Sequence, residues 1–198
     1  MASFSNHKIF SKTTKLGIMP CIGVLALQGG FEAHQKKMQA LGHSCLLVRN
    51  IEQLKKVNAL ILPGGESTAM IYLLKKHCLW NLLKEKVANT PILATCSGLI
   101  LLHKLGVLDI NIIRNGYGRQ LNSAVFPLTV TIANKRNTLD GFFIRAPLVK
   151  KIYDPTIEVL SYHQDDPVLL RKNNLIASTF HPELSNSSLI HNYFINSK

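Results

Sequence analysis

Long apolar runs and paired cysteines are both missing from this sequence. No stretch has the length and apolarity of a membrane-spanning helix or of a signal peptide. The four cysteines are scattered without a C-x-x-C pair, which argues against the common zinc-binding and dithiol motifs. We therefore expect a protein of the reducing cytoplasm, with no metal site and no cofactor.

Acidic residues are scarce: 11 stand against 23 lysines and arginines, and the formal net charge is +12. The lysines are dispersed in pairs, such as Lys36-Lys37, Lys55-Lys56 and Lys75-Lys76, instead of forming a basic tract. Nucleic-acid binding favours a clustered basic face with interleaved aromatic residues, so we expect no nucleic-acid partner. Solvated helix faces explain most of the charge, and an acidic protein partner stays open as an alternative.

The first 20 residues contain no acidic side chain and are rich in serine, threonine and lysine. This composition predicts a disordered N-terminal extension. A transit peptide has a similar composition, but the segment holds no arginine. The remaining residues, 21–198, show no internal repeat and no linker, so we predict one domain with an ordinary globular composition.

Short apolar runs alternate with helical patterns through the first half of the chain. The expected strands are Ile22–Leu27, Ser44–Val48, Ala59–Leu62 and Pro91–Ala94. The expected helices are Phe31–Leu41, a short helix from the N-cap Asn50 to Val57, Thr68–Lys76, Trp80–Ala88 and a helix from Gly98 to Lys104. This alternation predicts right-handed βαβ units, and hence a flavodoxin-like α/β fold with a mostly parallel open sheet and helices on both faces.

Shorter strand-like runs fill the second half. They are Leu128–Ile132, Phe142–Ile144, Ile157–Ser161, Val168–Arg171 and Leu175–Phe180. Asn173-Asn174 predicts a hairpin turn between the last two runs, and Leu189–Ile195 predicts a closing helix. We expect these strands to add in antiparallel fashion at one end of the sheet.

Cys96 stands where a buried strand gives way to an apolar helix start. A cysteine held on such a sharp turn projects its sulfur, and the free N–H groups of the helix favour the thiolate. The small neighbours Ser97 and Gly98 allow a substrate to approach the backbone. A buried structural cysteine is an equally good interpretation of this stretch alone.

A second run, Leu175–Ala177, leads to His181, which is followed two residues later by Glu183. A nucleophile needs a base and a base needs an orienting group, so this pair favours a catalytic Cys96. The carboxyl ends of parallel strands line the crevice of an open α/β sheet. Gln28-Gly29 and Gly64-Gly65-Glu66 should therefore converge there with Cys96, although a double glycine alone would indicate only a turn.

Six motifs in order make the sequence resemble a known family. They are Leu25-Ala26-Leu27-Gln28-Gly29, Pro63-Gly64-Gly65-Glu66-Ser67-Thr68, Thr95-Cys96-Ser97-Gly98-Leu99, Arg114-Asn115-Gly116-Tyr117-Gly118-Arg119-Gln120, Phe143-Ile144-Arg145-Ala146-Pro147 and Phe180-His181-Pro182-Glu183-Leu184. Together they resemble the glutaminase subunit of pyridoxal 5'-phosphate synthase, a triad (class I) glutamine amidotransferase. The cysteine and histidine motifs alone would indicate only the broader class.

The resemblance implies hydrolysis of L-glutamine to L-glutamate and ammonia, with Cys96 as nucleophile, His181 as general base and acid, and Glu183 orienting the histidine. The positions implied to bind glutamine are Gly64, Gly65, Glu66, Arg114, Ile144 and Arg145. Those implied in the oxyanion site and its activation are Gln28, Gly29, Gly65 and Ser97. The ammonia is implied to pass to a barrel-shaped synthase subunit in a hetero-oligomeric complex, whose docking switches on an otherwise poor glutaminase.

The chain departs from the family pattern at three places. Ser97 replaces the usual alanine, the segment from Lys104 to Arg114 is shorter than usual, and Asn122-Ser123-Ala124-Val125 replaces an Asp-Ser-Phe-Glu run. None of these changes touches the implied triad. Three alternatives remain open: a glutaminase serving another synthase, a cysteine hydrolase of related fold, and a catalytically silent assembly subunit.

Overall fold

The computed structural model describes residues 21–117 and 123–196. The N-terminal extension predicted for residues 1–20 lies outside the described residues, as does Asn122 of the altered segment. None of the helices in the described ranges has the length and apolarity that crossing a membrane requires.

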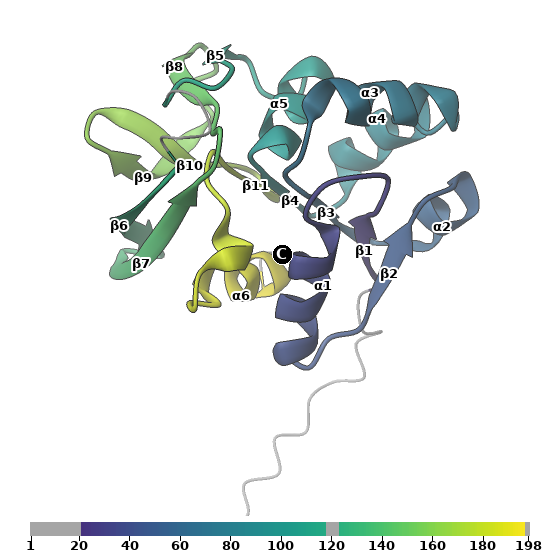
Figure 1. The fold of residues 1–198 in the computed structure, drawn as a ribbon, viewed down its shortest axis with the longest axis horizontal. Helices are drawn as coiled ribbons and strands as arrows, with labels where there is room; N and C mark the ends of the chain where they lie inside the picture. The colour runs from purple at the N-terminus through teal and green to yellow at the C-terminus, as the bar shows by residue number, and fades with distance from the viewer. Residues whose placement is uncertain (1–20, 118–122, 197–198) are drawn as a thin grey trace, which may run out of the picture.

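A seven-stranded sheet in the order β2-β1-β3-β4-β11-β10-β9 forms the centre of the molecule (Figure 1). The strands are β1 (Ile22–Leu25), β2 (Cys45–Val48), β3 (Ala59–Leu62), β4 (Ile92–Thr95), β9 (Glu158–His163), β10 (Asp166–Lys172) and β11 (Leu175–Ser178). All pairings from β2 to β11 are parallel, whereas β10 and β9 add in antiparallel fashion. The predicted α/β fold and its antiparallel additions are confirmed.

Helices cover both faces of this sheet (Figure 1). They are α1 (Phe31–Ala40), α2 (Ile51–Lys56), α3 (Ser67–Lys76), α4 (Trp80–Asn89), α5 (Ser97–Lys104) and α6 (Leu189–Asn196). Met38 of α1 and Phe194 of α6 share one core cluster, while Leu54, Leu83 and Leu99 of α2, α4 and α5 share the other. Because β1, β3, β4 and β11 are buried on both faces, their sequences are apolar except for Thr95 and Ser178 at the ends of β4 and β11.

Two small antiparallel sheets flank the β9 end. One pairs β5 (Ile110–Ile113) with β8 (Leu148–Ile152), and the other pairs β6 (Ala124–Ile132) with β7 (Lys135–Phe143). The hydroxyl of Ser161 on β9 donates to the carbonyl of Thr129 on β6 at 2.9 Å and links the β6–β7 sheet to the main sheet. The sequence prediction missed β5 and β8 and found only the ends of β6 and β7.

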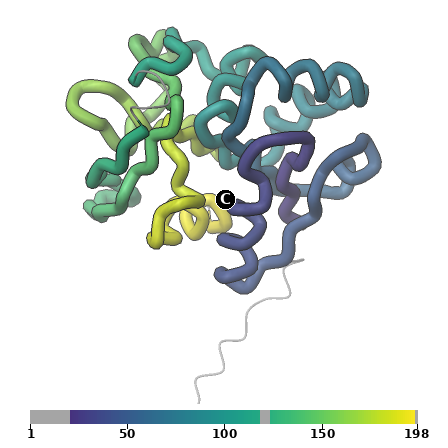
Figure 2. The backbone as a smooth tube through the Cα atoms, in the orientation of Figure 1, coloured from purple at the N-terminus to yellow at the C-terminus, as the bar shows by residue number. Residues whose placement is uncertain are grey.

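The pairing of β4 with β11 positions the site. The two strands run parallel with Thr95 opposite Ser178, so Cys96 and the segment that leads to His181 leave the sheet at the same edge. A two-residue turn at Asn173-Asn174 joins β10 to β11, as predicted, and Asn173 has a φ of 52°. Figure 2 shows the yellow C-terminal part of the chain returning to the middle of the molecule.

Candidate active site

Cys96 lies on a strained turn between β4 and α5. Its φ of 50° and ψ of −104° are unfavourable for a residue with a side chain, and its N–H donates to the carbonyl of Ser178 at 2.8 Å. A Cβ on Gly98 would lie 2.2 Å from the carbonyl oxygen of Leu62, so only glycine lets α5 pack this close to β3. The result is a cysteine at a helix N-terminus, as the sequence predicted, and it is 4% exposed.

His181 and Glu183 follow β11 and form a close pair. The backbone N–H of His181 donates to the carbonyl of Phe142 at 2.9 Å, which fixes the histidine against β7. Pro182 begins the short 3-10 turn η2 (Pro182–Leu184), which brings the Glu183 carboxylate back to the ring. Its Oε1 lies 2.7 Å from Nδ1 of His181, and only 1% of the Glu183 side chain is exposed.

The imidazole is coupled to both the sulfur and the carboxylate. Burial alone would lower the pKa of His181, but its hydrogen bonds to Cys96 and Glu183, and their charges, raise it to about 10. Burial also works against the charge of Glu183, but the adjacent His34 ring and the hydrogen-bonded, charged His181 lower the pKa of this carboxyl to about 2. At neutral pH the arrangement therefore favours a protonated His181 between the Cys96 sulfur and the Glu183 carboxylate.

Gly64 provides the space for this approach. A Cβ at this position would lie 2.4 Å from Cε1 of His181 and 3.2 Å from Cβ of Cys96. Any side chain at position 64 would push the imidazole away from the sulfur. The double glycine is thus explained by a close approach within the site, and not only by the turn after β3.

Gln28 and Gly29 support the glycine turn from below. The side chain of Gln28 donates to the Glu66 carbonyl at 3.0 Å and accepts from the Glu66 N–H at 3.1 Å. Gly29 has a φ of 85°, and a Cβ there would lie 1.9 Å from the Gly64 carbonyl oxygen. Three sequence-predicted loops therefore do converge at this edge of the sheet.

The Ser97 hydroxyl donates to the Gly65 carbonyl at 2.5 Å, so it fixes one peptide of the glycine turn. Ser97 is also the first residue of α5, where backbone N–H groups lack partners inside the helix. Across the site, the Cys96 Sγ lies 3.9 Å from the carbonyl oxygen of Ile144.

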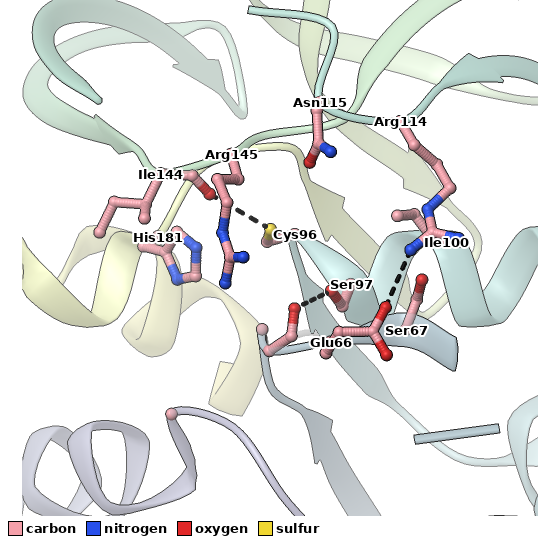
Figure 3. A pocket seen from close by; sticks show the side chains of 13 residues that line it. Glu66, Ser67, Cys96, Ser97, Ile100, Arg114, Asn115, Ile144, Arg145 and His181 are labelled. Atoms are coloured by element: carbon pink, nitrogen blue, oxygen red, sulfur yellow. Dashed lines mark hydrogen bonds and ion pairs between the residues drawn. The ribbon is translucent and has the colours of Figure 1, made fainter. Parts of the chain in front are cut away.

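A cavity of about 220 Å³ opens above the sulfur (Figure 3). Its lining includes nine of the predicted residues: Gly64, Gly65, Glu66, Cys96, Ser97, Arg114, Ile144, Arg145 and His181. It adds four that the sequence prediction missed: Gly30, Ser67, Ile100 and Asn115. In the described part of the chain, Gln28, Gly29 and Glu183 lie outside this lining and support it from behind.

Charged side chains gather at the rim of the cavity. Arg114 Nη2 lies 2.9 Å from Glu66 Oε1, and its Nη1 donates to the Thr68 hydroxyl at 3.2 Å. The same carboxylate caps α3 by accepting the N–H groups of Thr68 and Ala69 at 3.1 and 2.6 Å. These backbone hydrogen bonds, that of Ala69 above all, lower the pKa of Glu66. Glu66 therefore holds Arg114 in place while staying charged.

Residues 24–198 match the SNO glutamine amidotransferase family. The chain belongs to this family. A relative from Fervidobacterium nodosum, "Pyridoxal 5'-phosphate synthase subunit PdxT", is 43% identical over 184 residues, 88% of this chain and 95% of the relative. A relative of the same name from Francisella philomiragia subsp. philomiragia is 40% identical over 179 residues, 88% of this chain and 97% of the relative.

Solved structures agree with this membership. A crystal structure of a glutamine amidotransferase superposes with a TM-score of 0.81 at 36% identity, and the match covers 88% of this chain and 96% of that one. A putative GMP synthase protein from Thermoplasma acidophilum has a TM-score of 0.70 at 14% identity, covering 89% of this chain and 92% of that one. The second likeness concerns the fold alone. The family membership makes this chain an enzyme of the glutamine amidotransferase class.

Asn115 and the pair His34 and His191 show two reasons why sequence reasoning missed residues of this amidotransferase. Asn115 stands inside a motif that was used to recognise the family, and its φ of 51° marks it as part of a tight turn at the cavity. His34 and His191 have no such signal. They lie fully buried on α1 and α6, and only the fold brings them together behind Glu183.

Proposed function

We propose that this chain hydrolyses L-glutamine to L-glutamate and ammonia through Cys96, His181 and Glu183, and that the ammonia serves the synthesis of pyridoxal 5'-phosphate. The observation that carries the proposal is the placement of His181 between the Cys96 sulfur and the Glu183 carboxylate at the bottom of a cavity rimmed by arginines. We also propose that residues 21–198 form the glutaminase domain.

The first half-reaction is an attack by the Cys96 thiolate on the carbon of the glutamine side-chain amide. The new C–S bond places negative charge on the amide oxygen, where the N–H groups of Ser97 and Gly65 are the proposed donors. His181, protonated at the start, gives its proton to the leaving nitrogen. The C–N bond then breaks, ammonia leaves, and a thioester remains on Cys96.

The second half-reaction uses water. Neutral His181 now accepts a proton from the water, whose oxygen attacks the thioester carbon. The C–S bond breaks, glutamate forms, and Cys96 returns as a thiolate beside a protonated His181. The role proposed for Glu183 in both steps is to hold the Nδ1–H of His181, so that the other ring nitrogen faces the reacting atoms.

The proposed substrate contacts follow the charges of a free amino acid. Arg114 and Arg145 are the candidates for clamping the α-carboxylate, because a guanidinium matches a carboxylate in shape and charge. The Glu66 carboxylate already accepts two backbone N–H groups and the Arg114 guanidinium, so its role is to orient Arg114. The carbonyl of Ile144 faces the cavity and is a candidate for limiting how substrate sits over the sulfur.

The partner proposed for this chain is a synthase subunit. The names of the relatives describe them as subunits of pyridoxal 5'-phosphate synthase. We propose a barrel-shaped synthase subunit that receives the ammonia in a cytoplasmic hetero-oligomeric complex, and a glutaminase that works poorly without it. A shielded transfer fits a product that would otherwise be lost to solvent.

The deciding experiment follows the amide nitrogen. The chain is purified together with a co-expressed synthase partner, and the complex is supplied with glutamine labelled with nitrogen-15 in its side chain, a pentose phosphate and a triose phosphate. We expect glutamate release and labelled nitrogen in pyridoxal 5'-phosphate, both absent with Cys96→Ala. Failure to release glutamate with or without the partner would refute the glutaminase. Release without incorporation would mean that the chain serves another synthase.

A further inference from the structure

Behind the triad lies a second set of polar side chains that the proposed chemistry does not use. His34 on α1, His191 on α6 and Thr95 at the end of β4 are each 0% exposed. Nδ1 of His34 lies 3.0 Å from Nε2 of His191. Nε2 of His34 lies 3.2 Å from the Thr95 hydroxyl and 3.4 Å from Oε2 of Glu183.

The surroundings decide which His34 nitrogen carries its proton. Among the described residues, Oε2 of Glu183 has no hydrogen-bond partner, although its other oxygen binds His181. A bare Nε2 on His34 would point a lone pair at this buried carboxylate oxygen, which is unfavourable at low dielectric. The proton therefore sits on Nε2, facing Glu183 and Thr95.

The proton on His191 follows from the same reasoning. Burial lowers the pKa of His34 and lowers that of His191 to about 3, so both rings are neutral and carry one proton each. With its proton on Nε2, His34 accepts at Nδ1, so the Nε2–H of His191 must donate to it. Nδ1 of His191, which has no partner among the described residues, is then the bare nitrogen.

Thr95 connects this cluster to the opposite wall of the site. Its hydroxyl oxygen also accepts the N–H of Gly64 at 3.0 Å, and Gly64 begins the turn that faces His181 and Cys96. One N–H of His34 thus reaches both the carboxylate behind His181 and the threonine that holds the glycine turn. The Glu183–His181 pair and the Gly64 turn are therefore linked through His34 and Thr95.

We propose that His34 is a positioning residue for glutamine hydrolysis. It keeps Glu183 and the Thr95–Gly64 hydrogen bond in place, while His191 fixes the tautomer of His34. The reaction it serves rests on the proposed function, whereas the contacts themselves do not. Removing the Nε2–H takes away the polar group that lies 3.4 Å from Oε2 of Glu183, so the carboxylate shifts and His181 turns away from Cys96.

A pair of amide substitutions separates the two ring nitrogens of His34. The side-chain amide of asparagine lies near the position of Nδ1, while that of glutamine reaches the position of Nε2. His34→Asn keeps a polar partner for His191 but removes the N–H that faces Glu183 and Thr95. His34→Gln keeps an N–H at that position. Met38→Ala, one turn further along α1 and fully buried, is the control for loss of packing.

In glutamate release by the complex with its synthase partner, we expect His34→Asn to lower kcat about tenfold to a hundredfold with KM for glutamine within about twofold. We expect His34→Gln to recover most of kcat, and Met38→Ala to lower the melting temperature without lowering kcat. Equal losses in the two amide variants, or no loss in His34→Asn, would overturn the proposal.

A second readout needs no glutamine. Alkylation of Cys96 by iodoacetamide, followed by mass spectrometry of the peptide that contains it, measures the thiolate as a function of pH. The charged and titratable groups that face Glu183 are His34, His181, His191 and Lys37. We expect both His34→Asn and Glu183→Gln to move the alkylation midpoint to higher pH, and His34→Gln and Met38→Ala to leave it in place. An unmoved midpoint in His34→Asn would count against His34 even if the wild-type chain released no glutamate, an outcome that would refute only the proposed function.

Discussion

The floor and the rim of the cavity are built in opposite ways. At the floor, Cys96 is 4% exposed and the buried carboxylate of Glu183 has histidines on two sides. At the rim, the side chains of Arg114 and Glu66 are 56% and 46% exposed. Solvent screens the ion pair at the rim, which contributes about 1 kcal/mol or less to stability. An unpaired polar group at the floor costs about 1–3 kcal/mol.

This difference assigns different tasks to the two regions. A floor fixed by buried hydrogen bonds keeps the reacting groups aligned before substrate arrives, so changes there should lower kcat. A solvated rim holds charges that select the substrate but remain adjustable, so changes there should raise KM. The following predictions test this division, beginning with the largest expected effect.

Cys96→Ala should abolish glutamate release, because no other thiol lines the described cavity. The fold should persist, since Cys96 contributes one small side chain and the substitution shortens it. The measurement is glutamate release with circular dichroism as the control for folding. Glutamate release by the folded variant would show that the reaction does not use Cys96 at the floor of the cavity.

His181→Asn should be nearly as severe, because it removes the group that gives and takes the proton. Glu183→Gln should leave measurable activity, since the carboxylate orients His181 without exchanging protons with the substrate. Single-turnover rates in the complex would rank the two variants. An unaffected His181→Asn would exclude His181 as acid and base.

Arg114→Gln should raise KM for glutamine about tenfold while kcat changes little, because it removes a charge for the substrate carboxylate and leaves the floor intact. The melting temperature should hardly move, since the ion pair with Glu66 is half-exposed. Arg136→Gln on β7 is the matched control, because this arginine is exposed and does not line the cavity. A fall in kcat with unchanged KM would mean that Arg114 serves the reaction itself and not the binding of glutamine.

Acid should destabilise the protein through its buried neutral histidines. The pKa of His191 is lowered from 6.5 to about 3, so below pH 6.5 the unfolded chain binds a proton that the folded chain excludes. This difference amounts to about 2 kcal/mol at pH 5. Over the same range His181, with its pKa raised to about 10, is protonated in both states once the pH is well below 6.5.

His191→Gln removes this titration while its amide still donates to His34. The fall in melting temperature from pH 6.5 to pH 5 should therefore be several degrees smaller in the variant than in the wild type. Differential scanning calorimetry at both pH values provides the comparison. Equal falls would mean that His191 already takes up its proton in the folded state.

The parallel core was predictable because its signals are local. Strands buried on both faces are apolar over most of their length, as in Ala59–Leu62. Asn50 accepts the N–H of Gln53 at 2.9 Å as the predicted N-cap. β5 carries no comparable pattern. A register shift between Asn111 and Ile112 breaks its alternation, and among the described strands it pairs with β8 alone.

The site residues divide in the same way. The Cys96 turn and the His181–Glu183 pair were found because each combines a residue type with a strand end. The support given by Gly29 depends on a carbonyl of another loop, 1.9 Å from where its Cβ would be, and no local pattern reports such a contact. A bulky residue there would displace the Gly64 turn, so Gly29→Val should reduce the basal and the partner-stimulated rate alike.

The insertion of β11 beside β4 also sets the order in which the enzyme becomes complete during translation. Cys96 leaves the ribosome well before His181, and β4 has no neighbour on that side until the later strand has been made. A nascent chain therefore carries the nucleophile without its acid and base. Contacts so distant in sequence form late in folding. An incomplete chain consequently does not hydrolyse glutamine, because the last strand to enter the parallel part of the sheet is the one that leads to His181.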